Sequence, residues 1–291
     1  MKQTTFLVGA LLALAIPGSA AAEWFANLEA GTRHDNNLGN AQAASDIVSD
    51  SVLTASFSAG HTMQLDDGDS LTVQGHLKQE AYDRFHGVSN LSAGGEVDVK
   101  RKFGLGAYAP WVSTSLSSEY LRYGDRVRNG RLDHLGVRGG KRVGERWGVS
   151  AEYGFENRSA DCTTVDEPGF AGDAFKQRSR SLQFRADYAH NDSTFMFIGY
   201  ELRRGDVVTT TLSDSDSAYD VAKAISRDPA LGPNAYAYRI GGTTYSLHAG
   251  IGMAINPRIF ISLSYLRQVT HADGSNNYIK SLPALTGSYS F

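Results

Sequence analysis

The sequence lacks the features that would mark a disulfide-stapled protein or a helical membrane protein. It contains one cysteine, Cys162, so no disulfide can form within the chain. Beyond residue 22, no apolar run approaches the roughly 18 residues that a membrane-spanning helix requires. The formal net charge at pH 7 is only −3, which favours neither nucleic acid nor an anionic membrane surface as a partner.

The N-terminal residues have the organisation of a secretory signal peptide. Residues 1–22 place Lys2 before an apolar run at 6–16, and a Pro-Gly pair and small residues follow, up to Ala22. The apolar run is too short to span a membrane, so we expect cleavage after Ala22 and a mature domain of residues 23–291. A retained anchor helix is the alternative. Composition alone then fits a secreted all-β globular protein as well as any other class.

Alternation of apolar and polar residues identifies the fold class. Trp147, Val149, Ala151, Tyr153 and Phe155 fall on one face of their segment, while glycine, serine and glutamate fall on the other. Period-two alternation over about ten residues fits a tilted strand that crosses a bilayer. Twelve such segments lie near 24–34, 50–62, 70–83, 91–103, 110–123, 131–142, 147–158, 179–190, 194–208, 243–255, 259–271 and 278–291.

The connections between these segments alternate between tight turns and longer polar loops. The tight turns are at 65–69, 144–146, 191–193 and 256–258, and the longest loops are at 35–49, 159–178 and 209–242. Short turns on one side and long loops on the other, with an even strand number, are typical of outer-membrane barrels. We therefore predict an all-β protein, a transmembrane antiparallel β-barrel of about 12 strands with short periplasmic turns and longer extracellular loops. Both termini are then expected on the periplasmic side.

The C-terminus carries a family resemblance. The chain ends on Phe291, with Tyr289 and Gly287 at alternate positions before it, and this ending resembles the last strand of Gram-negative outer-membrane β-barrel proteins. The resemblance implies location in the outer membrane, with lipid and lipopolysaccharide as partners, and recognition of the last strand by the barrel assembly machinery. It identifies no subfamily. Pro283 cannot donate to a strand ladder, so we expect a bulge or a late start of pairing near residue 284.

A soluble β-sandwich or lipocalin-like barrel is the alternative fold, and it would bury its apolar face inward. The glycine- and serine-rich polar face favours the membrane barrel. Aromatic residues near the predicted strand ends also favour it, because interfacial girdles form there. These residues are Trp24, Trp111, Trp147, Tyr188, Phe195, Tyr245 and Tyr289.

The inward face should carry the function. If the apolar faces contact lipid, acidic and basic side chains reach the lumen in nearly equal numbers, which predicts no strong charge selectivity. The predicted pore-lining residues are Glu96, Lys100, Arg138, Arg185, Glu201 and Arg203. These charges either line a narrow polar channel or occlude it as an ion-pair network, and the sequence leaves both open.

The longest loop contains a pattern that suggests a helix. Ala218, Val221, Ala222 and Ile225 have helical spacing, with serine and aspartate at 214–217 as an N-cap and an Asp-Pro pair as a stop. Such a short amphipathic helix needs a surface for its apolar face. It can enter the mouth as a constriction or cap the extracellular rim, and we favour the cap.

Candidate chemistry is sparse. Ser246 and His248 share one strand face and form a conceivable Ser/His dyad, but we interpret them as polar lumen residues. The acidic and amide clusters at 34–37 and 214–216 lack the ligand spacing of a calcium loop. Cys162 lies among acidic residues, which disfavour a reactive thiolate. We predict no catalytic residue, metal site or cofactor.

The sequence thus favours a passive channel or transport conduit for small polar solutes with weak charge selectivity, and no nucleic-acid partner. An outer-membrane acyl hydrolase that acts on lipid is one alternative. A closed barrel that serves as a surface scaffold or as a component of an export assembly is another.

Overall fold

The computed structural model describes residues 23–163, 171–212 and 216–291. The predicted signal peptide, residues 1–22, lies outside the described residues. The strands are β1 (Glu23–Asp35), β2 (Asp50–Asp66), β3 (Asp69–Tyr82), β4 (Asn90–Lys102), β5 (Trp111–Tyr123), β6 (Gly130–Val143), β7 (Trp147–Arg158), β8 (Gln177–Ala189), β9 (Thr194–Thr211), β10 (Ala224–Arg227), β11 (Tyr236–Ala254), β12 (Ile259–Ala272) and β13 (Tyr278–Ser290). The helical pieces are α1 (Asp216–Tyr219) and the single 3-10 turns η3 (Ala44–Asp46), η4 (His86–Val88), η5 (Arg126–Arg128) and η6 (Asp273–Ser275).

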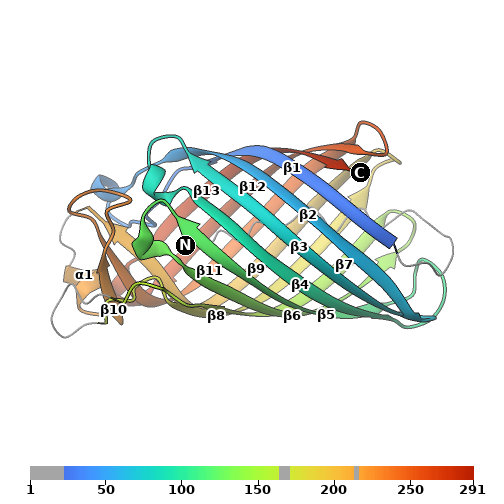
Figure 1. Cartoon of the computed structure of the whole chain (residues 1–291), viewed down its shortest axis with the longest axis horizontal. Helices are drawn as coiled ribbons and strands as arrows, with labels where there is room; N and C mark the ends of the chain where they lie inside the picture. The colour runs from blue at the N-terminus through green and yellow to red at the C-terminus, as the bar shows by residue number, and fades with distance from the viewer. Residues whose placement is uncertain (1–22, 164–170, 213–215) are drawn as a thin grey trace.

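The long strands form a closed, tilted barrel (Figure 1). Each of the long strands pairs antiparallel with the next long strand along the chain, so that β9 pairs with β11, and β1 pairs with β13 to close the sheet. The short strand β10 pairs with β11, makes an isolated parallel bridge to Ala171 through Ala224, and stands outside the closed ring. The predicted fold, a transmembrane antiparallel β-barrel of twelve strands, is confirmed.

Residue alternation explains which face points where. On β7 the apolar Val149 and Tyr153 are exposed on the outer wall, while Glu152 between them is buried. Serines on other strands are buried in the same way, such as Ser246 of β11 and Ser262 of β12. A continuous apolar outer wall suits lipid, because in water so much exposed apolar surface would drive association.

The two ends of the barrel differ as expected. Tight connections join β2 to β3, β6 to β7, β8 to β9 and β11 to β12 at one end, which we call the short-turn end. The opposite, long-loop end carries residues 36–49 and the described parts of the β7–β8 and β9–β11 connections, including α1 and β10 (Figure 1). Asn27 pairs with Ser290, so the first and last strands of the barrel meet at the short-turn end.

The strand that closes the barrel accommodates Pro283 by a late start of pairing. β13 pairs with β12 from Tyr278 onward, and Pro283 lies opposite Tyr265 in that ladder. Its pairing with β1 begins only at Ala284, opposite Arg33. The missing N–H of Pro283 therefore removes no bond from the β1–β13 ladder.

The helix predicted in the longest loop is largely wrong. The helical segment is a single turn, α1, and Ile225 lies in the strand β10, where it pairs with Tyr238 of β11. Strand pairing replaces the helix because β11 runs past the barrel rim. Beyond its pairing with β12, one edge of β11 is free, and β10 pairs with that edge. Among the residues that the structure describes, no helix has the length and apolar character needed to cross a membrane.

The aromatic residues divide between the two faces of the wall. Trp147 and Tyr188 face outward at the short-turn end with ring centroids 4.8 Å apart, as predicted for a girdle. Phe195 instead faces the lumen and stacks on Phe260 with centroids 4.9 Å apart. Trp111 also faces inward, where its ring packs over Gly140. Glycines on neighbouring strands leave the space for these inward rings, so strand-end position alone did not predict the face.

Candidate lumen and its covered mouth

One row of directly opposed residues crosses nine strands of the inner wall. It runs Lys100, Ser113, Arg138, Glu152, Gln183, Glu201, Ser246, Gln268 and Lys280, from β4 through β9 and β11 to β13. We call this the polar row. It contains three of the six predicted pore-lining residues, and every member is polar or charged. Antiparallel register therefore places these side chains beside one another along a path through the lumen.

Arg138 and Glu152 form the central ion pair of the polar row. Arg138 Nε donates to Glu152 Oε2 at 2.6 Å, and His134 Nε2 lies 3.8 Å from Glu152 Oε1. The Arg138 side chain nevertheless remains 44% exposed although it faces inward. This part of the lumen is therefore open to solvent.

Glu201 continues the polar row on β9. Its side chain is buried and accepts two hydrogen bonds, one from Gln183 Nε2 at 3.4 Å and one from the Ser246 hydroxyl. Arg203, two residues along the same face, lies 3.7 Å from Glu156 of β7. These two predicted residues therefore lie together on the wall, each with partners from other strands.

The remaining predicted residues lie elsewhere on the inner wall. Arg185 Nε donates to Asp187 at 2.9 Å on the same face of β8, and its guanidinium lies 4.4 Å from the Phe197 ring centroid. Lys100, at the first position of the polar row, places its Nζ 4.8 Å from the Trp111 ring centroid. The carboxylate of Glu96 accepts a hydrogen bond from the side chain of Gln74. The six residues form a distributed lining and no compact site.

A hairpin covers the long-loop end. The pairing of β11 with β12 ends at Gly242, but the pairing of β9 with β11 continues beyond it. The residues of β9 and β11 in this extension are mostly buried. We call residues 207–212 and 216–240 the mouth hairpin. One of its faces packs Ile225, Tyr238 and Ile240 together with Ala218 of α1. The other face packs Val208 and Ala237 against Ala174 and Phe175 of the β7–β8 connection.

The tip of the mouth hairpin reaches strands on the other side of the barrel. Leu231 and Ala235 share an apolar cluster with Leu38, Val52, Tyr82, Val88 and Ala230. Tyr82 ends β3 and Val88 lies in η4, five strands around the ring from β11. The hairpin therefore crosses the mouth and does not merely line its rim.

Two buried ion pairs fix the same end. Arg128 of η5 donates from Nε to Asp228 Oδ1 at 2.8 Å, and Thr210 donates to the other carboxylate oxygen at 2.8 Å. Burial lowers the pKa of Arg128, but Asp228 more than offsets this and the pKa stands above its ordinary value. Lys280, the last residue of the polar row, lies 2.7 Å from Asp35. No local sequence signal indicated the Arg128–Asp228 pair, because its partners are 100 residues apart.

The Ser246/His248 pair, considered above as a catalytic dyad, lies inside the barrel. Ser246 and His248 are both buried and inward, and the imidazole packs edge-on against Phe197 with ring centroids 4.8 Å apart. Ser246 receives a hydrogen bond from Gln268 at 3.4 Å. A lipid hydrolase needs its nucleophile where a lipid can reach it. The lumen-facing position predicted for these residues holds, and it removes them from the lipid-facing wall.

The candidate cation clusters gain no support. Asp35, in the first cluster, is buried beside Lys280, and the second cluster lies largely outside the described residues. Across 23–163, 171–212 and 216–291, no group of three or more His, Cys, Asp or Glu residues is placed to hold a metal ion.

Solved structures share this architecture at low sequence identity. An outer membrane channel from Pseudomonas putida F1 aligns with a TM-score of 0.60 and 13% identity, over 95% of this chain and 100% of that chain. The NanC porin aligns at 0.45 and 10%, over 91% and 98% of the two chains. The translocator domain of the autotransporter NalP from Neisseria meningitidis aligns at 0.44 and 10%, over 96% and 91%. These similarities concern the fold, and no curated protein sequence matches the chain significantly.

The family assignment comes from the sequence itself. Residues 87–282, well over half of the chain, match the family model described as outer membrane protein beta-barrel domain. The match covers the strands from β4 through β12 and the start of β13. The chain is therefore an outer-membrane protein and belongs to the outer membrane protein beta-barrel family.

Proposed function

We propose that the barrel is a passive channel or transport conduit for small polar solutes, with weak charge selectivity. The polar row carries this proposal. A wall needed only for structure can be filled by apolar side chains, whereas here opposed positions on nine strands are polar or charged. A polar wall gives a small polar solute the hydrogen-bonding partners that it loses on leaving water.

Weak charge selectivity follows from the pairing of the lumen charges. Arg138 with Glu152, Arg185 with Asp187, and Arg203 with Glu156 each place opposite charges within 4 Å. A permeating ion then meets a nearly neutral pair and not a ring of one sign.

The orientation is part of the proposal. Short turns on the periplasmic side and long loops outside are the general arrangement of outer-membrane barrels. The mouth hairpin is then extracellular, and both ends of the barrel domain are periplasmic. We also propose that the assembly machinery reads β13, which ends the barrel beside β1.

The covered mouth supports a second candidate. The Arg128–Asp228 pair and the Leu231 cluster hold the mouth hairpin across the opening. A barrel that stays closed would serve as a surface scaffold or as a component of an export assembly. The two candidates differ in whether current passes.

The reversal potential in a salt gradient tests the channel proposal. Residues 23–291 would be refolded and inserted into a planar bilayer with different KCl concentrations on the two sides. We expect discrete openings that reverse close to zero voltage, since paired charges favour neither ion. A reversal near the equilibrium potential of either ion would contradict weak selectivity, and silence would favour the closed barrel.

A further inference from the structure

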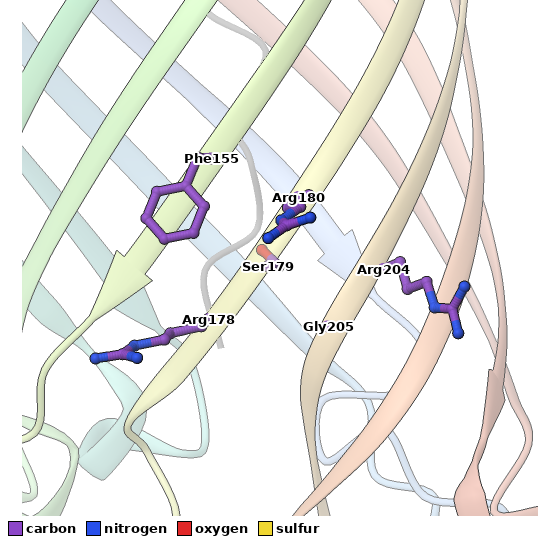
Figure 2. Close-up of a pocket in the computed structure, with 6 residues that line it drawn as sticks. All are labelled: Phe155, Arg178, Ser179, Arg180, Arg204 and Gly205. Atoms are coloured by element: carbon purple, nitrogen blue, oxygen red, sulfur yellow. The ribbon is translucent and has the colours of Figure 1, made fainter.

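The outer wall has an arginine cluster at the long-loop end of β8 and β9. The apolar outward positions end at Phe155 on β7 and at Leu182 on β8, and the next outward positions of β8 toward the loops are Arg180 and Arg178. Arg204 occupies the corresponding position on β9. Figure 2 shows the three guanidinium groups on this part of the wall, with the Phe155 ring beside them.

The strand register forces two of these charges together. Arg180 and Arg204 are directly opposed in the β8–β9 ladder, and Phe155 is opposite Arg180 in the β7–β8 ladder. Like charges at directly opposed positions destabilise a sheet. A hollow of about 280 Å³ lies at this place, lined by Phe155, Arg178, Ser179, Arg180, Arg204 and Gly205.

Gly205 makes the close approach of the two strands possible. Its φ is +153°, and a Cβ at this position would lie 2.6 Å from Ser179 Cα and against the Arg178 carbonyl oxygen. A larger residue would push β9 away from β8. The glycine therefore keeps Arg204 beside the arginines of β8.

Among the residues that the structure describes, no carboxylate neutralises the cluster. Within the described ranges, Arg178, Arg180 and Arg204 make no ion pair, and Arg178 Nε donates only to the amide oxygen of Asn157 at 3.1 Å. The carboxylate of Asp206, two residues after Arg204, accepts hydrogen bonds from Lys223 Nζ at 2.8 Å and from the backbone N–H of Arg178 at 3.0 Å. An exposed cation cluster of this kind is stabilised by an anion from outside the chain.

We propose that the arginine cluster binds a phosphate group of lipopolysaccharide in the outer leaflet. Guanidinium groups match phosphate oxygens with paired hydrogen bonds, and the edge of the apolar wall is the level of lipid headgroups. Phe155 and Leu182 supply the apolar surface on which an acyl chain would lie. The inference rests on the proposed orientation, with the long loops extracellular, and is independent of conduction through the lumen.

Binding of purified bisphosphorylated lipid A to the refolded protein in non-ionic detergent, measured by native mass spectrometry, tests the site. The test variant is Arg180→Gln/Arg204→Gln. The matched control is Arg122→Gln/Arg267→Gln, which removes two exposed outer-wall arginines of β5 and β12 that do not line the hollow. Loss of two charge-assisted contacts predicts affinity at least about tenfold weaker for the test variant and an unchanged affinity for the control. Equal affinity of wild type and test variant overturns the proposal.

Further arms separate the ligand sources and exclude misfolding. Dephosphorylated lipid A should bind wild type and test variant alike, whereas a remaining difference between them would overturn phosphate recognition. Inorganic pyrophosphate should bind far more weakly than lipid A, and equal binding would overturn the lipid source.

In phosphatidylcholine vesicles the test variant should unfold at no lower urea concentration than wild type, because it loses a like-charge pair. Arg204→Lys, which keeps the charge but not the paired donors, should bind with intermediate affinity, and full retention would overturn the phosphate geometry.

Discussion

Arg128 and Asp228 form a buried ion pair across the mouth of the barrel, with Arg128 Nε donating to Asp228 Oδ1 at 2.8 Å. Arg128 lies between β5 and β6, whereas Asp228 lies in the hairpin between β9 and β11. Arg128 also places its guanidinium 4.7 Å from the Phe175 ring centroid. The pair therefore connects three loop segments and holds the mouth hairpin in its crossing position.

Replacing Arg128 with leucine should release the mouth hairpin. Asp228 would stay buried without its cation, and breaking a buried pair from one side costs about 3–5 kcal/mol. We expect trypsin to cleave after Lys223 or Arg227 much faster than in wild type, at unchanged barrel folding. The measurement is limited proteolysis of the refolded protein in vesicles.

The double variant Arg128→Leu/Asp228→Leu provides the control for that experiment. It removes both charges and leaves no buried carboxylate unpaired, so protection should return in large part. Equal cleavage of the single and double variants would show that the ion pair does not hold the hairpin.

Replacing Gly252 with alanine should strain the inward aromatic stack. A Cβ at Gly252 would lie 2.6 Å from Phe195 Cζ and inside contact distance of Phe260 Cζ. Overpacking of this kind costs about 1–3 kcal/mol, which urea unfolding in vesicles would measure. Adding Phe260→Ala should recover part of the loss, and a double variant no better than Gly252→Ala would exclude this clash as the cause.

Unbalancing the central ion pair should change the selectivity. Glu152→Gln leaves the half-exposed Arg138 without its carboxylate and should raise the anion-to-cation permeability ratio about fivefold, the equivalent of about 1 kcal/mol. Arg138→Gln should shift the ratio the opposite way. Reversal potentials measure both, with Lys141→Gln on the outer face of β6 as the silent control. Shifts of the same sign for both variants would contradict this assignment.

Ser246→Ala should remove a lumen hydroxyl and nothing catalytic. The hydroxyl is hydrogen-bonded to Gln268 inside the barrel, away from lipid. Release of fatty acid from phospholipid vesicles should therefore stay at background for wild type and variant. Hydrolysis by wild type that Ser246→Ala abolishes would restore the acyl hydrolase interpretation.

The wall of the barrel was predictable because lipid outside and water inside impose one rule on every strand. The alternation in β7 placed Glu152 inward and Val149 outward, and the structure has both there. Strand pairing then follows because segments that are consecutive along the chain are usually neighbours in a sheet. The same alternation of outward apolar and inward polar residues predicted that Arg138 and Arg185 point into the barrel.

The mouth was not predictable, because its contacts join distant segments. The spacing of Ala218 and Ile225 fits a helix, yet Ile225 pairs with Tyr238 in a strand. Helical spacing records only which residues are apolar, and it says nothing of the free strand edge that β11 supplies. The inward direction of Phe195 depends likewise on a glycine of a neighbouring strand.

Single-channel conductance with and without the outer part of the mouth hairpin tests the central claim most directly. Thr211 and Tyr236 are directly paired, so residues 212–235 can be replaced by a two-residue Asn-Gly turn that continues the β9–β11 ladder. We predict small discrete openings for residues 23–291 and clearly larger ones for the shortened protein, because the polar row remains and its cover is gone. Silence of both folded proteins would contradict the channel proposal.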